Sequence, residues 1–510
     1  MAGLPIRGLR KTIYNKALNH YTLLRQVMVI ALFFFIICFS FQFKAFSQIN
    51  PEKSLKSESI TSSIQAQNDE DFTIVLVRMN GNYRIEQFYG NRPNVLSHMS
   101  IQAKNFQKKL VQFLEQGKQD GSVQAYHQFW IINAVLVHAH KTLIQQIEQR
   151  ADVLAVQDNY SLNLPEPEAL TPSIAADTPC EWGIEKIMAD RVWETYGLYG
   201  SNIRIGHLDT GVDGTHPDLS GKISRFAVID PYGSMIDADQ TAPYDSSNHG
   251  THTAGTMVGG NAGGTHIGVA PDAELLSAMV LNGGSGTFAQ VLGGIEWVID
   301  PDGNPHTDDG ADVVNLSLGA NGKYEDFIEP VESLVAADIF PVFSIGNSGP
   351  NTSSSPGNAP NGFGVGAVDA NSSVAYFSSG EKIEWNYPPY VGVWVKPDIC
   401  APGVSIKSSV PGGYSWLSGT SMASPHIAGV VALIRQANPD LTVEQIKTIL
   451  SITALDLGDE SKDTRYGWGL VNAYDAVSIA VSGDVPDELE EYDPDKAWAY
   501  IISPKSDQSL

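Results

Sequence analysis

The sequence predicts an α/β protein whose parallel sheet is covered by helices on both faces. Near-continuous apolar segments, typical of strands buried on both faces, recur between residues 182 and 479. The clearest of these segments are residues 203–208, 278–281, 313–316 and 340–345. Stretches with helical apolar spacing, such as residues 288–298, lie between them. Parallel strands need long crossover connections of this kind.

A second, smaller unit is predicted before this sheet, over residues 71–160. Apolar runs with strand character alternate there with two segments of helical spacing. The expected strands are residues 72–77, 123–132, 134–138 and 153–156, and the expected helices are residues 101–113 and 143–150. The resulting order, βαββαβ, is that of a small ferredoxin-like α+β unit. It contains no cluster of catalytic side chains.

The remaining parts of the chain are predicted as connections and ends. At about 150 residues per domain, a length of 510 suggests roughly three units. Residues 48–70 and 161–179 have the composition of linkers, the second with four prolines. We expect the larger α/β domain to span residues 180–481. Residues 482–510 follow as a solvated acidic tail, because seven acids occur within residues 483–495.

Charge and cysteine content exclude several classes of protein. The formal net charge is −25, and residues 161–510 alone carry −31. Nucleic acid is therefore a poor partner, because phosphate binding needs a basic face. Three cysteines cannot build a disulfide-dense scaffold or a zinc site of four cysteines.

Residues 1–47 predict export. They carry six basic residues and no acid, and residues 27–43 form an uncharged apolar run. Small residues two apart, Ala45 and Ser47, follow it as in a signal peptide. The run borders on the shortest stretch that spans a bilayer, so an uncleaved signal-anchor is the alternative, and only then is a membrane a partner. Export permits a disulfide between Cys180 and Cys400, and two separate buried thiols are the other possibility.

Three polar segments of the larger domain carry the residues for nucleophilic catalysis. Asp209 ends the first predicted strand and precedes Thr-Gly, His249 opens His-Gly-Thr-His-Thr-Ala-Gly-Thr, and Ser421 lies in Ser-Gly-Thr-Ser-Met-Ala-Ser-Pro-His. A serine nucleophile needs a base, and the base needs a carboxylate to hold its tautomer. If Ser421 opens a helix, its amide also points toward an oxyanion.

These segments resemble the subtilisin-like serine proteases, the subtilase family, from about Trp182 to Ala473. The order Asp, His, Ser is that of subtilisin. Further matching segments are residues 268–271, 294–297, 315–319, 396–403 and 467–473. The resemblance implies a subtilisin-like sheet with Asp209 as the orienting carboxylate, His249 as general base and acid, and Ser421 as nucleophile. It also implies that Asn347 donates its side-chain amide to the oxyanion.

The resemblance further implies where a polypeptide binds and how the enzyme is kept inactive. The segments expected to pair with an extended substrate are Gly284, Ser285, Gly286, Ser317, Leu318 and Gly319. Small residues there offer backbone groups to an added strand. Residues 71–160 resemble the inhibitor-type prodomain of the family, which makes them an intramolecular inhibitor removed by cleavage in the linker at residues 161–179.

No cofactor is expected for the chemistry, and the metal sites stay unassigned. Asp218 occupies a position that often ligates calcium in the family, but Ala262 replaces an asparagine of the companion loop. The acidic insertion at residues 300–309 is either a calcium site or a solvated loop, and its glycine is misplaced for an EF-hand. We expect His252 and His426 to be structural.

Position 207 and the loop after Asn347 are two further features of the predicted site. At position 207, where relatives usually have an aliphatic residue, we expect a buried neutral histidine with a hydrogen-bond partner. The loop after Asn347 contains small residues, such as Ser354, and no acid, so we expect broad, apolar substrate preference.

The sequence thus predicts an exported, self-processing serine endopeptidase. One rival is a binding or scaffold protein on a decayed protease fold, although no catalytic residue is missing. The other is a transpeptidase, which differs only in the acyl acceptor.

Overall fold

The structure is a computed structural model that describes residues 72–83, 85, 88–164, 168–169, 179–238 and 241–485. The predicted export segment, the first linker and the acidic tail beyond residue 485 lie outside these ranges. Among the described helices, none is both long and apolar enough to cross a membrane.

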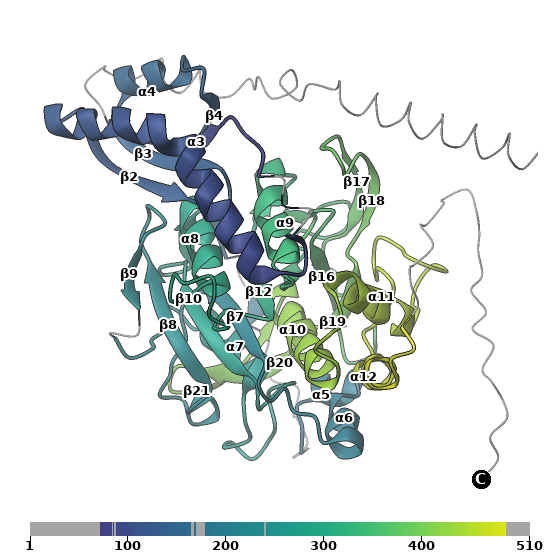
Figure 1. Ribbon diagram of the computed structural model, residues 1–510. Helices are drawn as coiled ribbons and strands as arrows, with labels where there is room; N and C mark the ends of the chain where they lie inside the picture. The colour runs from purple at the N-terminus through teal and green to yellow at the C-terminus, as the bar shows by residue number, and fades with distance from the viewer. Residues whose placement is uncertain are drawn as a thin grey trace, which may run out of the picture. The chain divides into compact units, whose positions relative to one another are not determined.

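The smaller unit has the predicted element order. Its elements are β1 (Phe72–Met79), α3 (Arg92–Asp120), β2 (Val123–Phe129), β3 (Ala134–His140), α4 (Lys141–Glu148) and β4 (Val153–Asp158). The four strands form one antiparallel sheet in the order β2-β3-β1-β4. Figure 1 labels β2, β3 and β4 of this sheet, with α3 and α4. The predicted ferredoxin-like arrangement is thereby confirmed.

Helix α3 is longer than the apolar spacing over residues 101–113 predicted. It starts after Asn91, whose side chain accepts a hydrogen bond from the Asn94 amide, and it ends at Gly121 with φ 84°. An N-cap and a left-handed glycine set helix ends independently of the apolar face. Apolar spacing therefore located the buried centre of the helix and not its ends.

The larger domain is built on a sheet of eight strands in the order β19-β16-β14-β12-β7-β10-β8-β9. In chain order, these are β7 (Arg204–Asp209), β8 (Ile223–Ile229), β9 (Met235–Ala238), β10 (Glu274–Met279), β12 (Val313–Leu316), β14 (Phe340–Ser344), β16 (Phe363–Val368) and β19 (Ile399–Pro402). All neighbouring pairs are parallel except β8 with β9. The predicted parallel α/β fold is confirmed (Figure 1).

Helices cover both faces of this sheet. They are α5 (Trp182–Lys186), α6 (Ala189–Tyr196), α7 (His249–Val258), α8 (Phe288–Ile299), α9 (Ile328–Ala336), α10 (Thr420–Ala437), α11 (Val443–Thr453) and α12 (Ala473–Ser482). In β12, Val313 belongs to the core that contains α7 and α10, whereas Val314 belongs to the core that contains α8 and α9. Successive strand residues point to opposite faces, so both sides of each central strand must be apolar.

Short strands and 3-10 turns complete the described part of the chain. The strands are β5 (Ser161–Asn163), β6 (Glu168–Ala169), β11 (Ser285–Thr287), β13 (Ala320–Asn321), β15 (Ser354–Ser355), β17 (Glu381–Trp385), β18 (Gly392–Lys396), β20 (Ile406–Val410) and β21 (Gly413–Ser418), and the 3-10 turns are η3 (Pro217–Leu219) and η4 (Glu325–Phe327).

The apolar run expected as a strand over residues 278–281 is shifted relative to β10. Pairing ends at Met279, and the amides of Val280 and Leu281 both donate to the carbonyl oxygen of Asp209, at 3.0 and 3.1 Å. The buried backbone is satisfied by this turn instead of a ladder. The same two hydrogen bonds fix the end of β7 at Asp209, one of the candidate site residues.

Candidate active site

The three residues expected to catalyse lie where elements of the larger domain end or begin. Asp209 is the last residue of β7, His249 is the first residue of α7, and Ser421 is the second residue of α10. Helices α7 and α10 pack against each other. All three residues are at most 1% exposed. In a parallel sheet the crevice beyond the carboxyl ends of the strands is the usual place for ligands.

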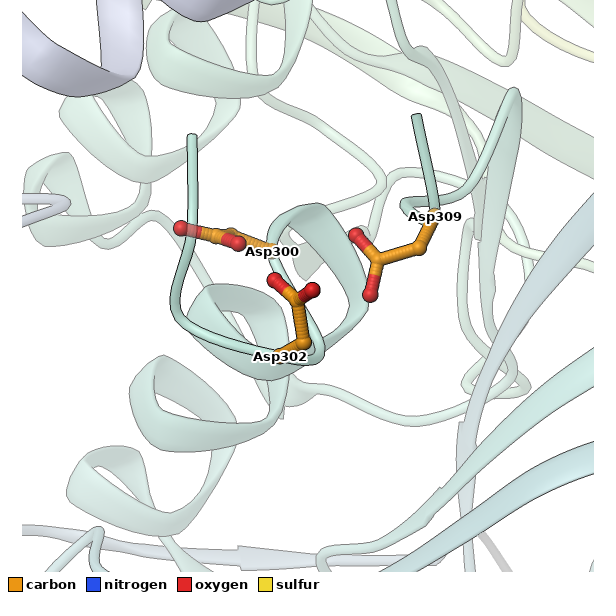
Figure 2. A group of neighbouring side chains, drawn as sticks. All are labelled: Asp300, Asp302 and Asp309. Atoms are coloured by element: carbon orange, nitrogen blue, oxygen red, sulfur yellow. The ribbon is translucent and has the colours of Figure 1, made fainter. Parts of the chain in front are cut away.

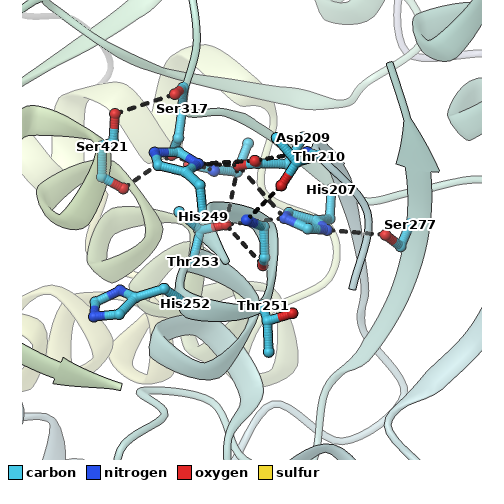
Figure 3. Close-up of polar contacts among 12 residues, drawn as sticks. His207, Asp209, Thr210, His249, Thr251, His252, Thr253, Ser277, Ser317 and Ser421 are labelled. Carbon is cyan, nitrogen blue, oxygen red and sulfur yellow. Dashed lines mark hydrogen bonds and ion pairs between the residues drawn. The ribbon is translucent and has the colours of Figure 1, made fainter. Parts of the chain in front are cut away.

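Asp209 and His249 are joined directly (Figure 3). The Nδ1 atom of His249 lies 2.8 Å from Oδ1 and 3.0 Å from Oδ2 of the carboxylate, and the Thr210 amide donates to Oδ1 at 2.7 Å. Burial opposes ionisation of Asp209, but the neighbouring His249 and His207 outweigh it and hold the pKa of the carboxyl below its ordinary value. An ionised carboxylate accepts only, so in the neutral imidazole Nδ1 carries the proton and Nε2 is the acceptor.

Ser421 and the free nitrogen of His249 are not hydrogen-bonded to each other. The Ser421 hydroxyl donates to the carbonyl oxygen of Ser317 at 3.1 Å, and the buried Nε2 of His249 has no hydrogen-bond partner among the described residues. A base whose acceptor is unoccupied can take a proton from a hydroxyl that rotates toward it. In enzymes without substrate, such catalytic hydrogen bonds are often long or unformed.

The side-chain amide of Asn347 has a defined orientation. Its Oδ1 accepts hydrogen bonds from the Thr420 amide at 2.9 Å and from the Thr420 hydroxyl at 2.8 Å. A backbone N–H can donate only to the oxygen, so Nδ2 is the donor that remains. Nδ2 lies 3.2 Å from where a Cβ on Gly419 would be, beside the start of α10.

The start of α10 supplies a second donor. The helix begins at Thr420, so the amide of Ser421 is among the first four N–H groups, which have no partner within the helix. The 18-residue helix also directs the positive end of its dipole toward this point. The Ser421 amide and Asn347 Nδ2 are therefore both suited to hold an oxyanion.

A strand of the same chain contacts both edge segments expected to bind substrate. β5 pairs antiparallel with β11, the amide of Leu164 donates to the Gly284 carbonyl at 3.0 Å, and Asn163 forms a bridge with Gly319. Gly284, Ser285, Gly286 and Gly319 thus present backbone to an extended segment. Leu318 instead packs its side chain into the core, while the carbonyl of Ser317 receives the Ser421 hydroxyl.

Two polar residues near Asp209, Thr253 and Ser277, were not predicted from the sequence. The hydroxyl of Thr253 lies 3.1 Å from Asp209 Oδ2 and 2.9 Å from His207 Nε2, and His207 Nδ1 lies 3.0 Å from Ser277 Oγ. The expectation that His207 is buried and hydrogen-bonded agrees with these contacts. Ser277 directly precedes the predicted strand at residues 278–281, and a hydroxyl residue inside the apolar run that starts at Leu275 was the signal available for it.

The other histidines of the motifs face away from the chemistry. His252 Nε2 lies 3.0 Å from the Ile406 carbonyl, and burial with the neighbouring His249 lowers its pKa to about 3. His426 Nδ1 lies 2.8 Å from the Met422 carbonyl, and burial lowers its pKa to about 4. Both rings are therefore neutral at physiological pH and form hydrogen bonds with backbone carbonyl oxygens. These contacts agree with their expected structural roles.

The carboxylate at the family's calcium position is satisfied within the protein. Asp218 Oδ1 accepts from the Ala262 amide, and Oδ2 accepts from the Tyr414 hydroxyl. Ala262 therefore contributes a backbone donor where a cation would need an oxygen ligand. These contacts do not fit a calcium ion at Asp218.

The acidic insertion brings Asp300, Asp302 and Asp309 together, with carboxylate oxygens within 4.8 Å of one another (Figure 2). Oxygen ligands suit hard divalent cations. Burial and the other two carboxylates raise the pKa of Asp300 to about 6. Asp302 Oδ1 also accepts hydrogen bonds from the Asn304 amide and the Thr307 hydroxyl. Such bonds within the loop can hold its conformation without a metal ion. The arrangement is compatible with a cation and with a solvated loop.

The two described cysteines remain apart. Cys180 and Cys400 are both buried, and no disulfide joins them. Of the two possibilities left by the sequence, the structure has the separate thiols.

An ionised carboxylate, an imidazole with an open nitrogen and a serine at a helix start are the residue set of a serine hydrolase. The model of the subtilase family matches residues 200–469, more than half of the chain. The chain belongs to the subtilase family, and it is a serine-type endopeptidase.

Curated relatives agree with this assignment. M-protease of Shouchella clausii (strain KSM-K16) is 34% identical over 373 residues, covering 72% of this chain and 88% of that protein. Subtilisin DY of Bacillus licheniformis is 37% identical over 297 residues, covering 57% of this chain and 96% of that protein. Bacillopeptidase F of Bacillus subtilis (strain 168) is 36% identical over 428 residues, which are 78% of this chain but only 29% of that protein.

Proposed function

We propose that this chain is an exported, self-processing endopeptidase that hydrolyses polypeptides through Asp209, His249 and Ser421. The observation that carries the proposal is the hydrogen bond between Asp209 and His249 Nδ1, which leaves Nε2 unoccupied in the site that contains Ser421. The basic residues and apolar run of residues 1–47 support export, with a signal-anchor as the other form.

In the proposed reaction, the Ser421 hydroxyl rotates away from Ser317 and attacks the peptide carbonyl while His249 Nε2 takes its proton. Asp209 stabilises the imidazolium, and Asn347 Nδ2 with the Ser421 amide holds the oxyanion. His249 then gives the proton to the leaving amine, which departs with the C-terminal part of the substrate. Water, deprotonated by the same nitrogen, hydrolyses the acyl-enzyme and regenerates the hydroxyl.

We propose that the βαββαβ unit is the inhibitor of this enzyme. It shares a core with the larger domain, in which Phe129 and Leu136 are grouped with Leu292 and Ile295 of α8. The amides of Trp130 and Ile131 both donate to Oε1 of Glu296, at 2.5 and 2.8 Å. An apolar core with buried hydrogen bonds is typical of a stable, specific interface.

The chain that follows this unit passes along the site. β5 occupies the edges formed by residues 284–286 and Gly319, and β6 pairs with Leu417 and Ser418 of β21, just before Ser421. A strand added to these edges blocks access to other polypeptides. Because β5 pairs with the edge segments and β6 pairs with the residues just before Ser421, we propose that self-cleavage falls between these two strands, between Leu164 and Glu168.

Processing provides the direct test. Purified full-length protein is expected to yield a mature form whose first residue lies within positions 165–168, and intact mass spectrometry with N-terminal sequencing reads it. Peptides digested by that form should show gain of water and no ligation products. A mature N-terminus outside the interval would contradict the cleavage assignment, and ligated products would favour a transpeptidase.

Glu296 offers a test of the docked inhibitor. Burial raises the pKa of this carboxyl to about 8, against the two amides that donate to it. Glu296→Ala leaves those amides without an acceptor, which costs about 1–3 kcal/mol for each buried group. After self-cleavage, we expect the inhibitor unit to dissociate at least about tenfold faster, seen as a shorter lag before a chromogenic peptide is cleaved.

The matched control is Glu296→Gln, which keeps an oxygen acceptor without charge. Its lag should stay near that of the unchanged protein. Equal lags for the alanine and glutamine variants would mean that the Glu296 contact does not hold the inhibitor.

A further inference from the structure

A continuous line of buried polar groups lies behind the carboxylate of Asp209, beyond the imidazole of His249 (Figure 3). It runs from Ser277 of β10 through His207 of β7 to Thr253 of α7. The steps are 3.0 Å from Ser277 Oγ to His207 Nδ1, 2.9 Å from His207 Nε2 to Thr253 Oγ1, and 3.1 Å from Thr253 Oγ1 to Asp209 Oδ2. All four residues are 0% exposed.

The protons on this line can be placed in one consistent direction. The Asp209 carboxylate accepts only, so the Thr253 proton points to Oδ2 when Thr253 itself receives a bond from His207 Nε2–H. Nδ1 of His207 is then the acceptor for the Ser277 hydroxyl. If the His207 proton were on Nδ1, the Thr253 proton would be drawn to Nε2 and Asp209 would lose this donor. The tautomer of His207 therefore decides how Asp209 is bonded.

The hydrogen bond from Thr253 matters for Oδ2 of Asp209 in particular. Oδ1 already accepts from the Thr210 amide and is the nearer atom to His249, whereas Oδ2 has Thr253 as its other close donor. The alternative acceptor for Thr253 is the Gly250 carbonyl, also at 3.1 Å, which is neutral. A charged acceptor forms the stronger bond, so the carboxylate is favoured.

We propose that Thr253, oriented by His207 and Ser277, is a positioning residue that fixes the carboxylate plane of Asp209 and shares its negative charge. This inference rests on the proposed function, because it concerns the reaction of the same site. None of the three residues reaches the substrate; each acts on His249 through Asp209. Two consequences follow for the enzyme, one for its rate and one for its pH profile.

The rate consequence comes from orientation. Without the Thr253 hydroxyl, the carboxylate can rotate about its last bond, and His249 is held less well for proton transfer. We expect Thr253→Val, which keeps the shape of the side chain, to lower kcat by about tenfold with little change in KM, the worth of about one hydrogen bond to a charged group.

The pH consequence comes from charge. A carboxylate that loses a donor attracts the imidazolium of His249 more strongly, so the acid limb of kcat/KM should move to higher pH in Thr253→Val. Groups that face this pair are His207, 3.8 Å from Asp209 Oδ2, and His252, whose pKa burial lowers to about 3. A residue that served only folding would not move this limb.

The experiment compares kcat, KM and the pH profile of the mature enzyme and its variants, normalised by active-site titration. The matched control is Thr256→Val, one turn along α7, because this buried threonine bonds only to the His252 carbonyl, at 3.1 Å, among the contacts described. It should keep wild-type kcat and pH profile. Thermal melts of all variants separate loss of fold from loss of positioning.

Variants of His207 provide an independent check. His207→Gln retains a donor for Thr253 and an acceptor for Ser277, so it should lie nearer to wild type than His207→Leu. When His207→Leu is combined with Thr253→Val, it should cause no further shift of the acid limb. The two effects are not additive because His207 acts on Asp209 only through Thr253.

The outcomes separate this inference from the proposed function. An active wild-type enzyme whose Thr253→Val variant retains kcat and the acid limb overturns the positioning role alone. A shift of the limb equal in Thr256→Val overturns it as well. A correctly folded, fully processed wild-type protein without peptidase activity overturns the proposed function, and this inference falls with it.

Discussion

Replacement of Ser421 with alanine is expected to abolish peptide hydrolysis and to leave the full-length chain uncleaved. The substitution removes the hydroxyl that is proposed to form the acyl-enzyme, while the backbone amide and Asn347 stay in place. The fall in kcat should be roughly a million-fold, the magnitude known for the nucleophile of subtilisin. Intact mass spectrometry of purified Ser421→Ala protein, with a peptidase assay, measures both effects.

The variant should fold, because within the described part of the chain the Ser421 hydroxyl donates one hydrogen bond, to the Ser317 carbonyl. Wild-type enzyme added in trans distinguishes the modes of processing: the linker of Ser421→Ala should then be cleaved by the added enzyme. Normal maturation of Ser421→Ala alone would contradict self-processing, and measurable hydrolysis would contradict the assignment of the nucleophile.

Replacement of Asn347 with leucine should give the second-largest loss. Its side-chain oxygen accepts from Thr420, so Nδ2 is the donor that remains for the proposed oxyanion contact. Loss of such a donor lowers kcat by about 10²–10³-fold, the range found for the corresponding asparagine of subtilisin, because the bond strengthens as charge develops on the oxygen. KM should change little, and steady-state kinetics of titrated enzyme separates the two.

A graded variant tests the same geometry. Thr420→Val removes the hydroxyl bond to Asn347 Oδ1 but keeps the backbone amide bond, so the loss in kcat should be smaller than for Asn347→Leu. If Asn347→Leu raised KM and left kcat unchanged, Asn347 would be a ground-state binding residue and not an oxyanion donor.

The proposed processing would leave most of the negative charge of the chain on the mature enzyme. If cleavage falls between Leu164 and Glu168, the enzyme that remains has nearly all of the −31 counted from residue 161 onward. The edge segments proposed to bind substrate offer backbone groups of residues such as Gly284 and Gly319, so the proposed peptide binding does not depend on this charge. Such a net charge favours solubility.

Local signals in the sequence determined most of the fold. Apolar runs of β12 and β14 match the predicted strands closely, because a strand buried on both faces must be apolar throughout. The end of β10 and the length of α3 were not predictable in this way. A turn bonded to Asp209 ends the first, and caps outside the apolar pattern end the second.

The sequence by itself supplied the candidate residues of the site: Asp209, His249, Asn347 and Ser421 lie in motifs that can be read without coordinates. Only the tertiary structure decided what supports them. The parallel register of β7 and β10 pairs His207 with Ser277, and the packing of α7 brings Thr253 to Asp209. Likewise, only the folded chain lays β5 along the edges of the site. Chemical identity is encoded locally, whereas contacts between distant segments depend on register and packing.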